Sequence, residues 1–527
     1  MSLVVRIKRA LISVSDKTGL DDLVKTLNEF DVEIISTGGT AKRIAQLGIP
    51  VRSVSDVTQF PEMLDGRVKT LHPKIHGGLL ALRDNQEHLK QVKDFDIELI
   101  DMVVVNLYPF ENTVSDPNVV FEQAIENIDI GGPSMLRSAA KNARSVAVIC
   151  NPKRYKDIIS ELKANHGALS AQTRTKLAAE VFKRTYEYDR AIAFYLQNKI
   201  EQQNLKEQFP EILELRFEKV QDLRYGENPQ QKAAFYKENN SIMTSIANAR
   251  QLHGKELSFN NIIDLNAALN IVKDFQDPTA SIVKHTNPCG AASADNLSLA
   301  YKNALECDPM SAFGSIVGFN RKVEAATARE ILSADFVECI IGPGFSVEAL
   351  EMLKKKKNLR IMDVNNFVGL DFGSLPELDY KRVSGGLLIQ QNNIKIIDQD
   401  KLKVVTTRIP TPEQMKALLF SWTIVKHVKS NAIVLGQGTK TVGVGAGQMS
   451  RVDSVMIAIR KAGIRCPGAV LASDAFFPKA DSIEQAAKAG IRAIIQPGGS
   501  IRDQEVIDAA EKAQIAMVFT GMRHFCH

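Results

Sequence analysis

The sequence predicts an α/β protein built from two domains, and three observations lead to this fold class. Short apolar runs alternate with amphipathic stretches along the chain, which is the pattern of strands covered by helices. The chain has 527 residues, which is too many for one hydrophobic core. Apolar residues make up 44% of the chain and charged residues 24%, the composition of a globular protein.

The first part of the chain has the clearest alternation. Residues 20–30 are predicted to form a helix, because their leucine, valine and phenylalanine side chains follow helical spacing. A tight Thr-Gly-Gly-Thr turn at 37–40 leads into a second predicted helix at 41–47. The continuous apolar runs further along indicate parallel strands covered on both faces. The predicted strands lie at residues 10–14, 32–36, 102–106 and 146–150.

The predicted domain boundary follows a polar stretch of helical pattern at residues 155–208, which ends near Phe209-Pro210. We therefore place one α/β domain at residues 1–199 and a second at residues 200–527. The second domain repeats one order of elements, which suggests an internal duplication. The repeated pairs are a strand at 280–284 with a helix at 297–305, and a strand at 432–435 with a helix at 453–462; a third strand–helix group closes the chain.

The net charge indicates which kinds of molecule the protein binds, and the cysteine pattern indicates its compartment. The net charge is only +5, and the longest basic run, four lysines at 354–357, is predicted to be a solvated helix end, so we expect small anionic substrates and no nucleic acid. No run approaches the roughly 18–20 apolar residues of a membrane span, and we expect no signal peptide. The six cysteines form no C-x-x-C pair, which favours reduced thiols in a cytoplasmic protein without a metal site.

Two turns in the first domain are candidate anion sites. The segments 13–19 and 36–40 each follow a predicted strand and open a helix, and both are rich in serine, threonine and glycine. Free backbone N–H groups at a helix start bind phosphate well. Ser15 and Thr40 can equally be plain helix caps, and both readings stay open for either turn taken alone. Neither segment matches the P-loop pattern.

Cations and polar groups follow in the same domain. Arg67 and Lys69 alternate, so an extended segment points both to one face, where they can hold a phosphate and polarise a carbonyl. The alternative is an exposed strand edge guarded by cations. Residues 106–110 close a predicted strand, which is where ligands bind in open α/β sheets.

The second domain places Lys284 and His285 directly after a predicted strand and before a Pro-Cys-Gly turn. A lone histidine is more often structural, but an adjacent lysine at a strand end favours a catalytic role. A zinc deaminase would need H-x-E and P-C-x-x-C, and neither motif is present. Too few ligands remain for a tetrahedral zinc site.

The N-terminal motifs carry a family resemblance. Ser-Val-Ser-Asp-Lys-Thr-Gly, Ser-Thr-Gly-Gly-Thr, Gly-Arg-Val-Lys-Thr-Leu-His-Pro and Asn-Leu-Tyr-Pro-Phe occur in this order within residues 10–150. They resemble the IMP cyclohydrolase domain of the bifunctional purine enzymes, which is similar in fold to methylglyoxal synthase. The resemblance therefore implies a three-layer domain of that type.

The second half resembles the AICAR transformylase domain of the same family, whose duplicated halves have a cytidine-deaminase-like fold without its zinc. The resemblance spans residues 215–527 and is less close at Gln230 and Glu338, where some relatives have histidine and aspartate. Its motifs are Leu-Arg-Tyr-Gly-Glu-Asn-Pro at 223–229, Lys-His-Thr-Asn-Pro-Cys-Gly at 284–290, Asp-Pro-Met-Ser-Ala-Phe-Gly at 308–314, Ser-Asn-Ala-Ile at 430–433, Gly-Ala-Gly-Gln-Met-Ser-Arg at 445–451 and Ser-Asp-Ala-Phe-Phe-Pro at 473–478.

The resemblance implies the last two steps of purine nucleotide synthesis. Formyl passes from 10-formyltetrahydrofolate to AICAR (5-aminoimidazole-4-carboxamide ribonucleotide), and formyl-AICAR then closes to IMP with loss of water. For formyl transfer the resemblance implies proton transfer by His285 with support from Lys284. It implies nucleotide contacts at Arg224, Tyr225, Asn261, Gly314, Asn431, Arg451 and Arg523, and folate contacts at Met310, Ser311, Phe476 and Asp481.

For ring closure the resemblance implies catalytic roles for Lys69, Tyr108, Asp129 and Lys141. It also implies a homodimer, a folate cosubstrate and no catalytic metal. The alternatives are a phosphometabolite-binding regulatory protein with an inactive deaminase-like domain, or an enzyme in which one site has decayed. The residues implied to bind the ribose and phosphate are Ser13, Ser15, Lys17, Thr37, Gly38, Gly39, Thr40, Arg67, Thr70, Asn106 and Gly131.

Overall fold

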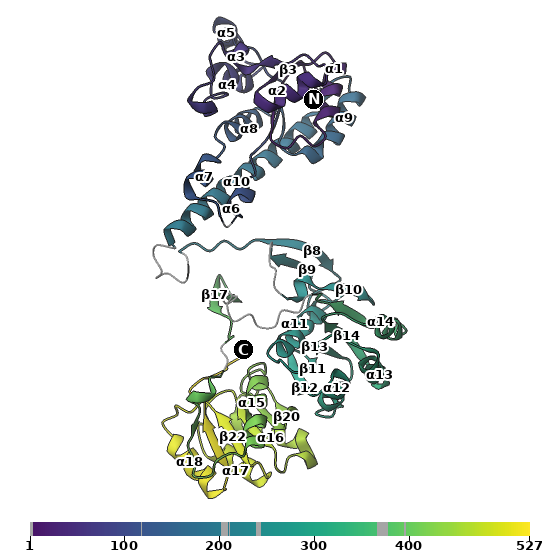
Figure 1. Ribbon diagram of the computed structural model, residues 1–527, viewed down its shortest axis with the longest axis vertical. Helices are drawn as coiled ribbons and strands as arrows, with labels where there is room; N and C mark the ends of the chain where they lie inside the picture. Colours follow the sequence, from purple (N-terminus) through teal and green to yellow (C-terminus); the bar gives the residue numbers. More distant parts are fainter. Residues whose placement is uncertain are drawn as a thin grey trace. The chain divides into compact units, whose positions relative to one another are not determined.

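A computed structural model describes residues 4–116, 118–201, 209, 211–238, 244–365, 378–394 and 397–527 (Figure 1). The chain divides into two compact units, Met1–Leu213 and Glu214–His527. The predicted boundary between residues 199 and 200 lies in the last turn of helix α10 (Ala171–Glu201), and Pro210 lies outside the described residues. The boundary thus stays a prediction, while the contacts divide the chain after Leu213.

Unit 1 is a parallel sheet covered by helices on both faces. Its five strands run in the order β4-β3-β2-β5-β6, and every neighbouring pair is parallel. Successive residues of β5 therefore enter two different cores: Met102 and Val104 pack on one face, Val103 and Val105 on the other. The strands are β2 (Arg9–Val14), β3 (Glu33–Ser36), β4 (Arg52–Ser53), β5 (Met102–Asn106) and β6 (Ala147–Ile149).

The helices of unit 1 form the two outer layers. One face is covered by α1 (Leu20–Glu29), α2 (Gly38–Gln46) and α9 (Tyr155–Ala164). The other is covered by α3 (Val54–Thr58), α4 (Pro73–Leu80), α8 (Gly131–Lys141) and α10. The remaining elements are β1 (Val5–Arg6), α5 (Gln86–Asp94), α6 (Phe110–Val114), α7 (Phe121–Glu126) and β7 (Ala168–Leu169).

One continuous helical stretch at residues 155–208 was a wrong expectation. Helix α9 ends at Ala164, and a short strand, β7, separates it from α10. His166 and Gly167 both have positive φ, at 49° and 86°, which a continuing right-handed helix does not allow. The predicted strands and the helix at 20–30 agree with the structure to within one or two residues.

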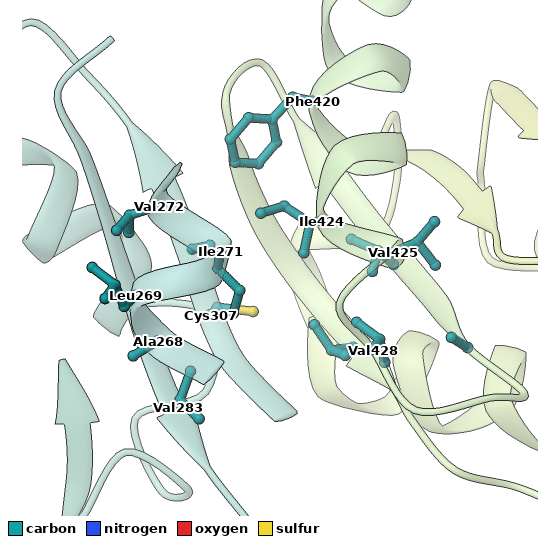
Figure 2. Close-up of a cluster of buried hydrophobic side chains, with 14 of the residues drawn as sticks. Ala268, Leu269, Ile271, Val272, Val283, Cys307, Phe420, Ile424, Val425 and Val428 are labelled. Carbon is teal, nitrogen blue, oxygen red and sulfur yellow. The ribbon is translucent and has the colours of Figure 1, made fainter. Parts of the chain in front are cut away.

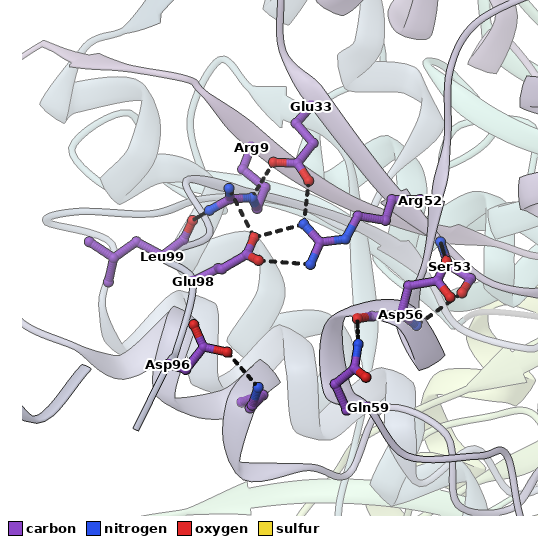
Figure 3. A network of polar contacts seen from close by, with 10 residues as sticks. Arg9, Glu33, Arg52, Ser53, Asp56, Gln59, Asp96, Glu98 and Leu99 are labelled. Atoms are coloured by element: carbon purple, nitrogen blue, oxygen red, sulfur yellow. Dashed lines mark hydrogen bonds and ion pairs between the residues drawn. The ribbon is translucent and has the colours of Figure 1, made fainter. Parts of the chain in front are cut away.

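An ion-pair network ties together the amino ends of the strands of unit 1 (Figure 3). The Glu33 carboxylate forms ion pairs with Arg9 at 2.6 Å and with Arg52 at 2.8 Å. Glu98, which precedes β5, forms ion pairs with Arg9 at 2.9 Å and with Arg52 at 2.7 Å. The hydrogen bond from Arg52 lowers the pKa of the Glu98 carboxyl below its ordinary value. These ion pairs lie at the amino ends of the strands. The carboxyl ends, where ligands bind in open α/β sheets, lie at the opposite edge.

Unit 2 contains one sheet of twelve strands in the order β10-β15-β14-β13-β11-β12-β20-β19-β21-β22-β23-β18. The first half consists of β10 (Arg250–His253), α11 (Phe259–Lys273), β11 (Thr279–Lys284), β12 (Asn287–Ser293), α12 (Leu297–Leu305), β13 (Ser315–Phe319), α13 (Ala325–Ser333), β14 (Val337–Gly342), α14 (Val347–Leu353) and β15 (Arg360–Asp363). Two hairpins, β8 (Phe217–Leu223) with β9 (Ala233–Glu238) and β16 (Leu378–Val383) with β17 (Gly386–Gln391), accompany the large sheet.

The second half of the sheet repeats the first, which confirms the predicted duplication. In each half an antiparallel hairpin is followed by three mutually parallel strands, with one antiparallel strand at the outer edge. The third predicted strand–helix group is therefore part of the second half. Its elements are β18 (Lys403–Val404), α15 (Pro412–Val425), β19 (Ile433–Gln437), β20 (Lys440–Gly445), α16 (Arg451–Ala462), β21 (Val470–Ser473), α17 (Asp481–Lys488), β22 (Ala493–Gln496), α18 (Asp503–Lys512) and β23 (Ala516–Phe519).

The two halves meet at the pairing of β12 with β20 and share one apolar core. Figure 2 shows buried side chains of both helices in this cluster, with Ile271 of α11 on the side toward Phe420 and Ile424 of α15. The rings of Phe275 and Phe420 lie 5.3 Å apart. Most of the apolar side chains in the central turns of both helices are buried, so close packing at this seam holds the two halves in one register.

A fragment of residues 1–213 should fold alone and unfold in a single cooperative transition, because unit 1 has its own two cores. Chemical denaturation followed by circular dichroism measures this. A matched fragment ending at residue 170 lacks α10, whose Val181 and Tyr188 complete one core, and should not show native near-ultraviolet signals. A cooperative transition in the shorter fragment would contradict the role given to α10.

Two candidate active sites

Unit 1 has a cavity of about 870 Å³ at the carboxyl edge of its sheet. It is lined by the ends of β2 and β5, the first turns of α2 and α8, and the segments around Arg67 and Asp129. Segments far apart in sequence therefore meet where parallel strands end. The predicted residues that line it are Ser13, Ser15, Lys17, Thr37, Gly38, Gly39, Thr40, Arg67, Lys69, Thr70, Asn106, Tyr108, Asp129 and Gly131.

Asn106 fixes the loop that follows β2. Its Oδ1 accepts hydrogen bonds from Ser15 N and Ser15 Oγ, both at 2.7 Å, and from Asp16 N at 2.9 Å. Its Nδ2 donates to Asp16 O at 2.8 Å. Thr40 binds the same strand end, because its hydroxyl contacts both Val14 N and Val14 O at 3.0 Å. Asn106 and Thr40 thus shape one wall of the cavity. Neither Ser15 nor Thr40 is a helix cap, because α1 has Gly19 and α2 has Thr37 at the N-cap position.

Two helix starts and three cations make the cavity suited to an anion. Helix α2 begins at Gly38-Gly39 without a side-chain cap, so its first backbone N–H groups lack a capping side chain. Helix α8 begins at Gly131, where Asp129 Oδ1 accepts the N–H of Gly132 at 2.8 Å. A Cβ on Gly39 would meet no atom within 4 Å, which leaves space for a ligand to approach the backbone. The side chains of Lys17, Arg67 and Lys69 also line this space.

Two carboxylates that the sequence reading missed pair with these cations. Glu62 lies 2.6 Å from Lys69 Nζ, and Glu126 pairs with Arg67. Glu126 comes from α7 and lies 59 residues from Arg67 in sequence, so no local spacing reveals the pair. These carboxylates occupy the cations with charge-assisted hydrogen bonds, which are the same interactions that an anionic ligand would form.

Asp129 is a half-buried titratable group of the cavity. Burial raises the pKa of its carboxyl above the ordinary value, although hydrogen bonds from the backbone N–H groups of Gly132 and Tyr108 act in the opposite direction. Its Oδ1 accepts from Gly132 N at 2.8 Å, and its own N–H donates to Tyr188 Oη at 2.7 Å. A raised pKa suits a group that takes up and releases a proton during a reaction.

Lys141 does not lie with the other predicted catalytic residues. It ends α8, whereas Gly131 at the start of that helix lines the cavity. At a rise of about 1.5 Å per residue the two positions are about 15 Å apart along the axis. Lys141 is exposed and is not among the residues that line the cavity. Its catalytic role therefore stays a prediction, and this geometry gives it no support.

In unit 2, His285 lies at the tip of the β11–β12 hairpin. Lys284 pairs with Asn287, so His285 and Thr286 are the two residues of the turn, with φ of 52° and 63°. This left-handed conformation costs residues other than glycine about 1–3 kcal/mol each. His285 N and Thr286 N donate to the buried Asp264 carboxylate at 3.2 and 2.7 Å. The histidine side chain is exposed, so it is available to a substrate.

The neighbours of this turn connect it to the second half of the sheet. Lys284 Nζ donates to Phe313 O at 2.8 Å, which brings the lysine to the segment that carries Gly314. Asn287 Oδ1 accepts from Lys429 N at 3.0 Å, two residues before Asn431. Burial raises the pKa of the nearby Cys289 thiol to about 12, so this cysteine is not a thiolate nucleophile at neutral pH.

Asn431, Arg451 and Asn261 make internal contacts in this structure. Arg451 is buried, pairs with Asp474 and donates to Asn431 Oδ1 at 2.7 Å. Asn431 Nδ2 donates to Gln448 O at 2.8 Å. Asn261 belongs to the capping box of α11. Substrate contacts by these three residues stay predictions, and what the structure describes is a set of side chains that hold loops in place.

The other predicted residues of unit 2 lie on surface segments. Met310 is 89% exposed, and Ser311 N donates to Asp308 Oδ1 at 3.1 Å, within a loop that Lys461 holds by an ion pair with Asp308. Gly314 has φ of 73°. The remaining residues are Arg224 over the ring of Tyr225, the partly exposed Phe476, Asp481 in the first turn of α17, and Arg523 over the ring of Phe525.

Metal-ligand clusters and membrane-spanning helices are both absent from the part of the chain that the structure describes. Among the described residues, no group of three or more histidine, cysteine, aspartate or glutamate side chains could hold a metal ion. In the described ranges, no helix is both long enough and apolar enough to cross a membrane. All six cysteines are free.

Comparisons with known proteins cover nearly the whole chain. The family model described as AICARFT/IMPCHase bienzyme matches residues 139–461, and that of an MGS-like domain matches residues 19–134. The chain is similar to the bifunctional purine biosynthesis protein PurH of Ruminiclostridium cellulolyticum (54% identity) and of Bacillus cereus (53%), covering 99% of this chain and 100% of each relative. The solved structure titled "Crystal structure of ForH" matches 35% of this chain and 94% of its own at 32% identity, with a TM-score of 0.33.

Replacing Gly132 with alanine should destabilise unit 1 by about 1–3 kcal/mol, because the new Cβ would lie 2.4 Å from Asp129 Oδ2 and 3.0 Å from Leu107. Urea denaturation measures the free energy of unfolding. Gly39→Ala is the matched control: it also adds a methyl group at the start of a helix, but in open space, and should be neutral or stabilising by up to about 1 kcal/mol. Equal effects of the two changes would show that the packing around Asp129 is loose.

Proposed function

The chain belongs to the AICARFT/IMPCHase bienzyme family, and on that premise we propose that its two units divide the two reactions between them. The protein is a bifunctional purine biosynthesis enzyme with a formyltransferase and a cyclohydrolase activity. The observation that carries this conclusion is the identity of 53–54% with PurH proteins over 99% of the chain. We assign ring closure to the cavity of unit 1 and formyl transfer to the His285 turn of unit 2.

For formyl transfer we propose 10-formyltetrahydrofolate as the donor and AICAR as the acceptor. The exocyclic amine of AICAR attacks the formyl carbon, the bond to the folate nitrogen breaks, and one proton must leave the amine. An exposed imidazole at His285 suits this proton transfer, because histidine is the side chain most often used as a general acid or base in enzymes. The Lys284 ammonium, hydrogen-bonded to Phe313 O at 2.8 Å, can stabilise the developing oxyanion.

For ring closure the carboxamide nitrogen of formyl-AICAR attacks the formyl carbon of the same molecule, and the carbinolamine then loses water. No nucleophile from the protein is required, so binding a folded substrate already lowers the barrier. The two helix starts and the cations around Arg67 suit the substrate phosphate. Lys69 can stabilise the carbinolamine oxygen, while Asp129 and Tyr108, which line the same cavity, can move protons.

We further propose that the enzyme is a cytoplasmic homodimer, with the transferase site built across the subunit boundary as the family resemblance implies. Several large apolar side chains of unit 2 support this, because they are strongly exposed in the single chain. Examples are Met449, Met310 and Val347, at 96, 89 and 77% exposure. The regulatory, non-catalytic alternative has no support from the relatives.

The two activities should be separable by mutation. His285→Ala should lower formyl transfer by about 10²–10⁴-fold, because it removes the group that handles the amine proton. Ring closure of supplied formyl-AICAR should survive, because it occurs in the other unit. Lys69→Met should do the converse, so that formyl-AICAR accumulates. Both rates are measured from the absorbance change with each substrate supplied separately.

Lys141→Ala is the informative companion to Lys69→Met, since family likeness assigns both lysines to ring closure and only Lys69 lines the cavity. A loss in the Lys141 variant as large as in the Lys69 variant would place the reacting atoms elsewhere in unit 1. If His285→Ala leaves formyl transfer normal in a folded protein, the histidine is structural. If either of the first two variants abolishes both activities without unfolding, the two-site assignment is wrong.

Ring closure should lose rate as the pH falls through a pKa above the ordinary carboxyl value of about 3.9. Burial raises the pKa of Asp129, so its carboxylate takes up a proton at a higher pH than an exposed aspartate and then no longer accepts a proton from the substrate. The pH profile of kcat measures this inflection. Asp129→Asn should lower kcat and remove the inflection; an unchanged profile in that variant would assign proton transfer to another group.

A further inference from the structure

The tip of the β11–β12 hairpin is held in a conformation that its own residues disfavour. His285 and Thr286 both have left-handed φ, and Thr286 is β-branched. Two-residue hairpin turns with two positive φ values are normally built from asparagine and glycine. The turn therefore needs support from outside the hairpin, and this support also decides where the His285 side chain points.

The duplicated half of the sheet provides an internal comparison. There the hairpin of β19 and β20 closes at Gln437 paired with Lys440, so its two-residue turn is Gly438-Thr439. Gly438 has φ of 56°, close to the 52° of His285, and glycine adopts this value without steric cost. The fold thus requires a left-handed residue at this position in both halves. Only the first half uses a bulky side chain for it.

Asp264 of α11 supplies the support in the first half. Its two carboxylate oxygens each accept one backbone N–H: Oδ2 from His285 at 3.2 Å and Oδ1 from Thr286 at 2.7 Å. Asp264 is 7% exposed and lies on a helix whose neighbouring Leu265 is fully buried, so the carboxylate is held by a rigid element. Asn287 Nδ2 adds a hydrogen bond to His285 O at 3.1 Å. Both sides of the His285 backbone are thereby fixed.

We propose that Asp264 is a positioning residue for formyl transfer: it holds the His285-Thr286 turn in its left-handed form and so aims the imidazole at the amine of the acceptor. This rests on the proposed role of His285 as the proton carrier. Asp264 touches the backbone of the turn and not the imidazole, so it acts on the rate only through the direction of the His285 side chain. A displacement of about 1 Å in a reacting group can cost about 10²-fold in rate.

The test is a cycle of variants of the full-length enzyme. Asp264→Asn removes one of the two acceptors and should lower kcat for formyl transfer about tenfold or more, with the KM for AICAR within about twofold of the wild type. Ring closure should not change. Asp363→Asn is the matched control, because Asp363 is equally buried in the same unit and accepts Asn365 N at 2.8 Å but does not touch the turn. It should leave kcat unchanged.

The second arm repeats Asp264→Asn in a His285→Gly background with free imidazole added. Imidazole from solution needs no positioned turn, so Asp264→Asn should there change the rate by no more than about twofold. A full loss in that background would mean that Asp264 acts on the substrate or the fold, which overturns the proposal. So would a wild-type kcat for Asp264→Asn. A normal rate for His285→Gly without imidazole would instead defeat the proposed function of His285.

Should Asp264→Asn fail to fold, Asp264→Glu replaces it in the same cycle. It keeps both acceptor oxygens but moves them by one methylene, so the loss in kcat should be smaller and should again vanish in the His285→Gly background. A loss that persists in that background overturns the proposal as before. Circular dichroism and the KM for AICAR verify that each variant keeps a native unit 2.

Discussion

The pairing of β12 with β20 is the contact on which unit 2 depends. Thr441 Oγ1 contacts Ala291 N at 2.9 Å and Ala291 O at 3.2 Å, and Ser293 N donates to Thr439 O at 2.9 Å. The buried seam between α11 and α15 covers the same junction (Figure 2). Because the junction joins the halves in one register, Asn287 reaches Lys429 and Lys461 reaches the loop at Asp308. The junction thus links the turn that carries His285 to the segment that precedes Asn431.

The common direction of the strands in the sheet of unit 1 separates its ion-pair network from its cavity. All five strands are parallel, so their amino ends share one edge of the sheet and their carboxyl ends the other. The network of Arg9, Glu33, Arg52 and Glu98 neutralises one edge, while helix starts and cations collect at the opposite edge (Figure 3). The ion-pair network and the cavity thus lie at opposite ends of the same strands.

The sequence predicts the strands and the turns that follow them well, but it predicts contacts between residues far apart in the chain poorly. The turns at 13–19 and 36–40 follow strands, so their meeting in one cavity could be inferred from parallel topology. Motif order also does not reveal that α8 separates Lys141 from Gly131 by about three turns, so the place of Lys141 outside the cavity lining could not be predicted. Asp264 carries no motif; its role depends on φ values and on a helix packed under a hairpin, and neither is encoded in spacing. The pairing of Glu126 with Arg67 could not be predicted either, because the two residues lie 59 positions apart in sequence.

A time course of the full-length enzyme with AICAR and 10-formyltetrahydrofolate tests most directly whether one chain performs both reactions in sequence. Chromatographic separation of AICAR, formyl-AICAR and IMP follows each species. The account predicts that formyl-AICAR rises and falls while IMP accumulates, with one tetrahydrofolate released for each IMP formed. Release of tetrahydrofolate without IMP, or binding of AICAR without any turnover, would contradict it.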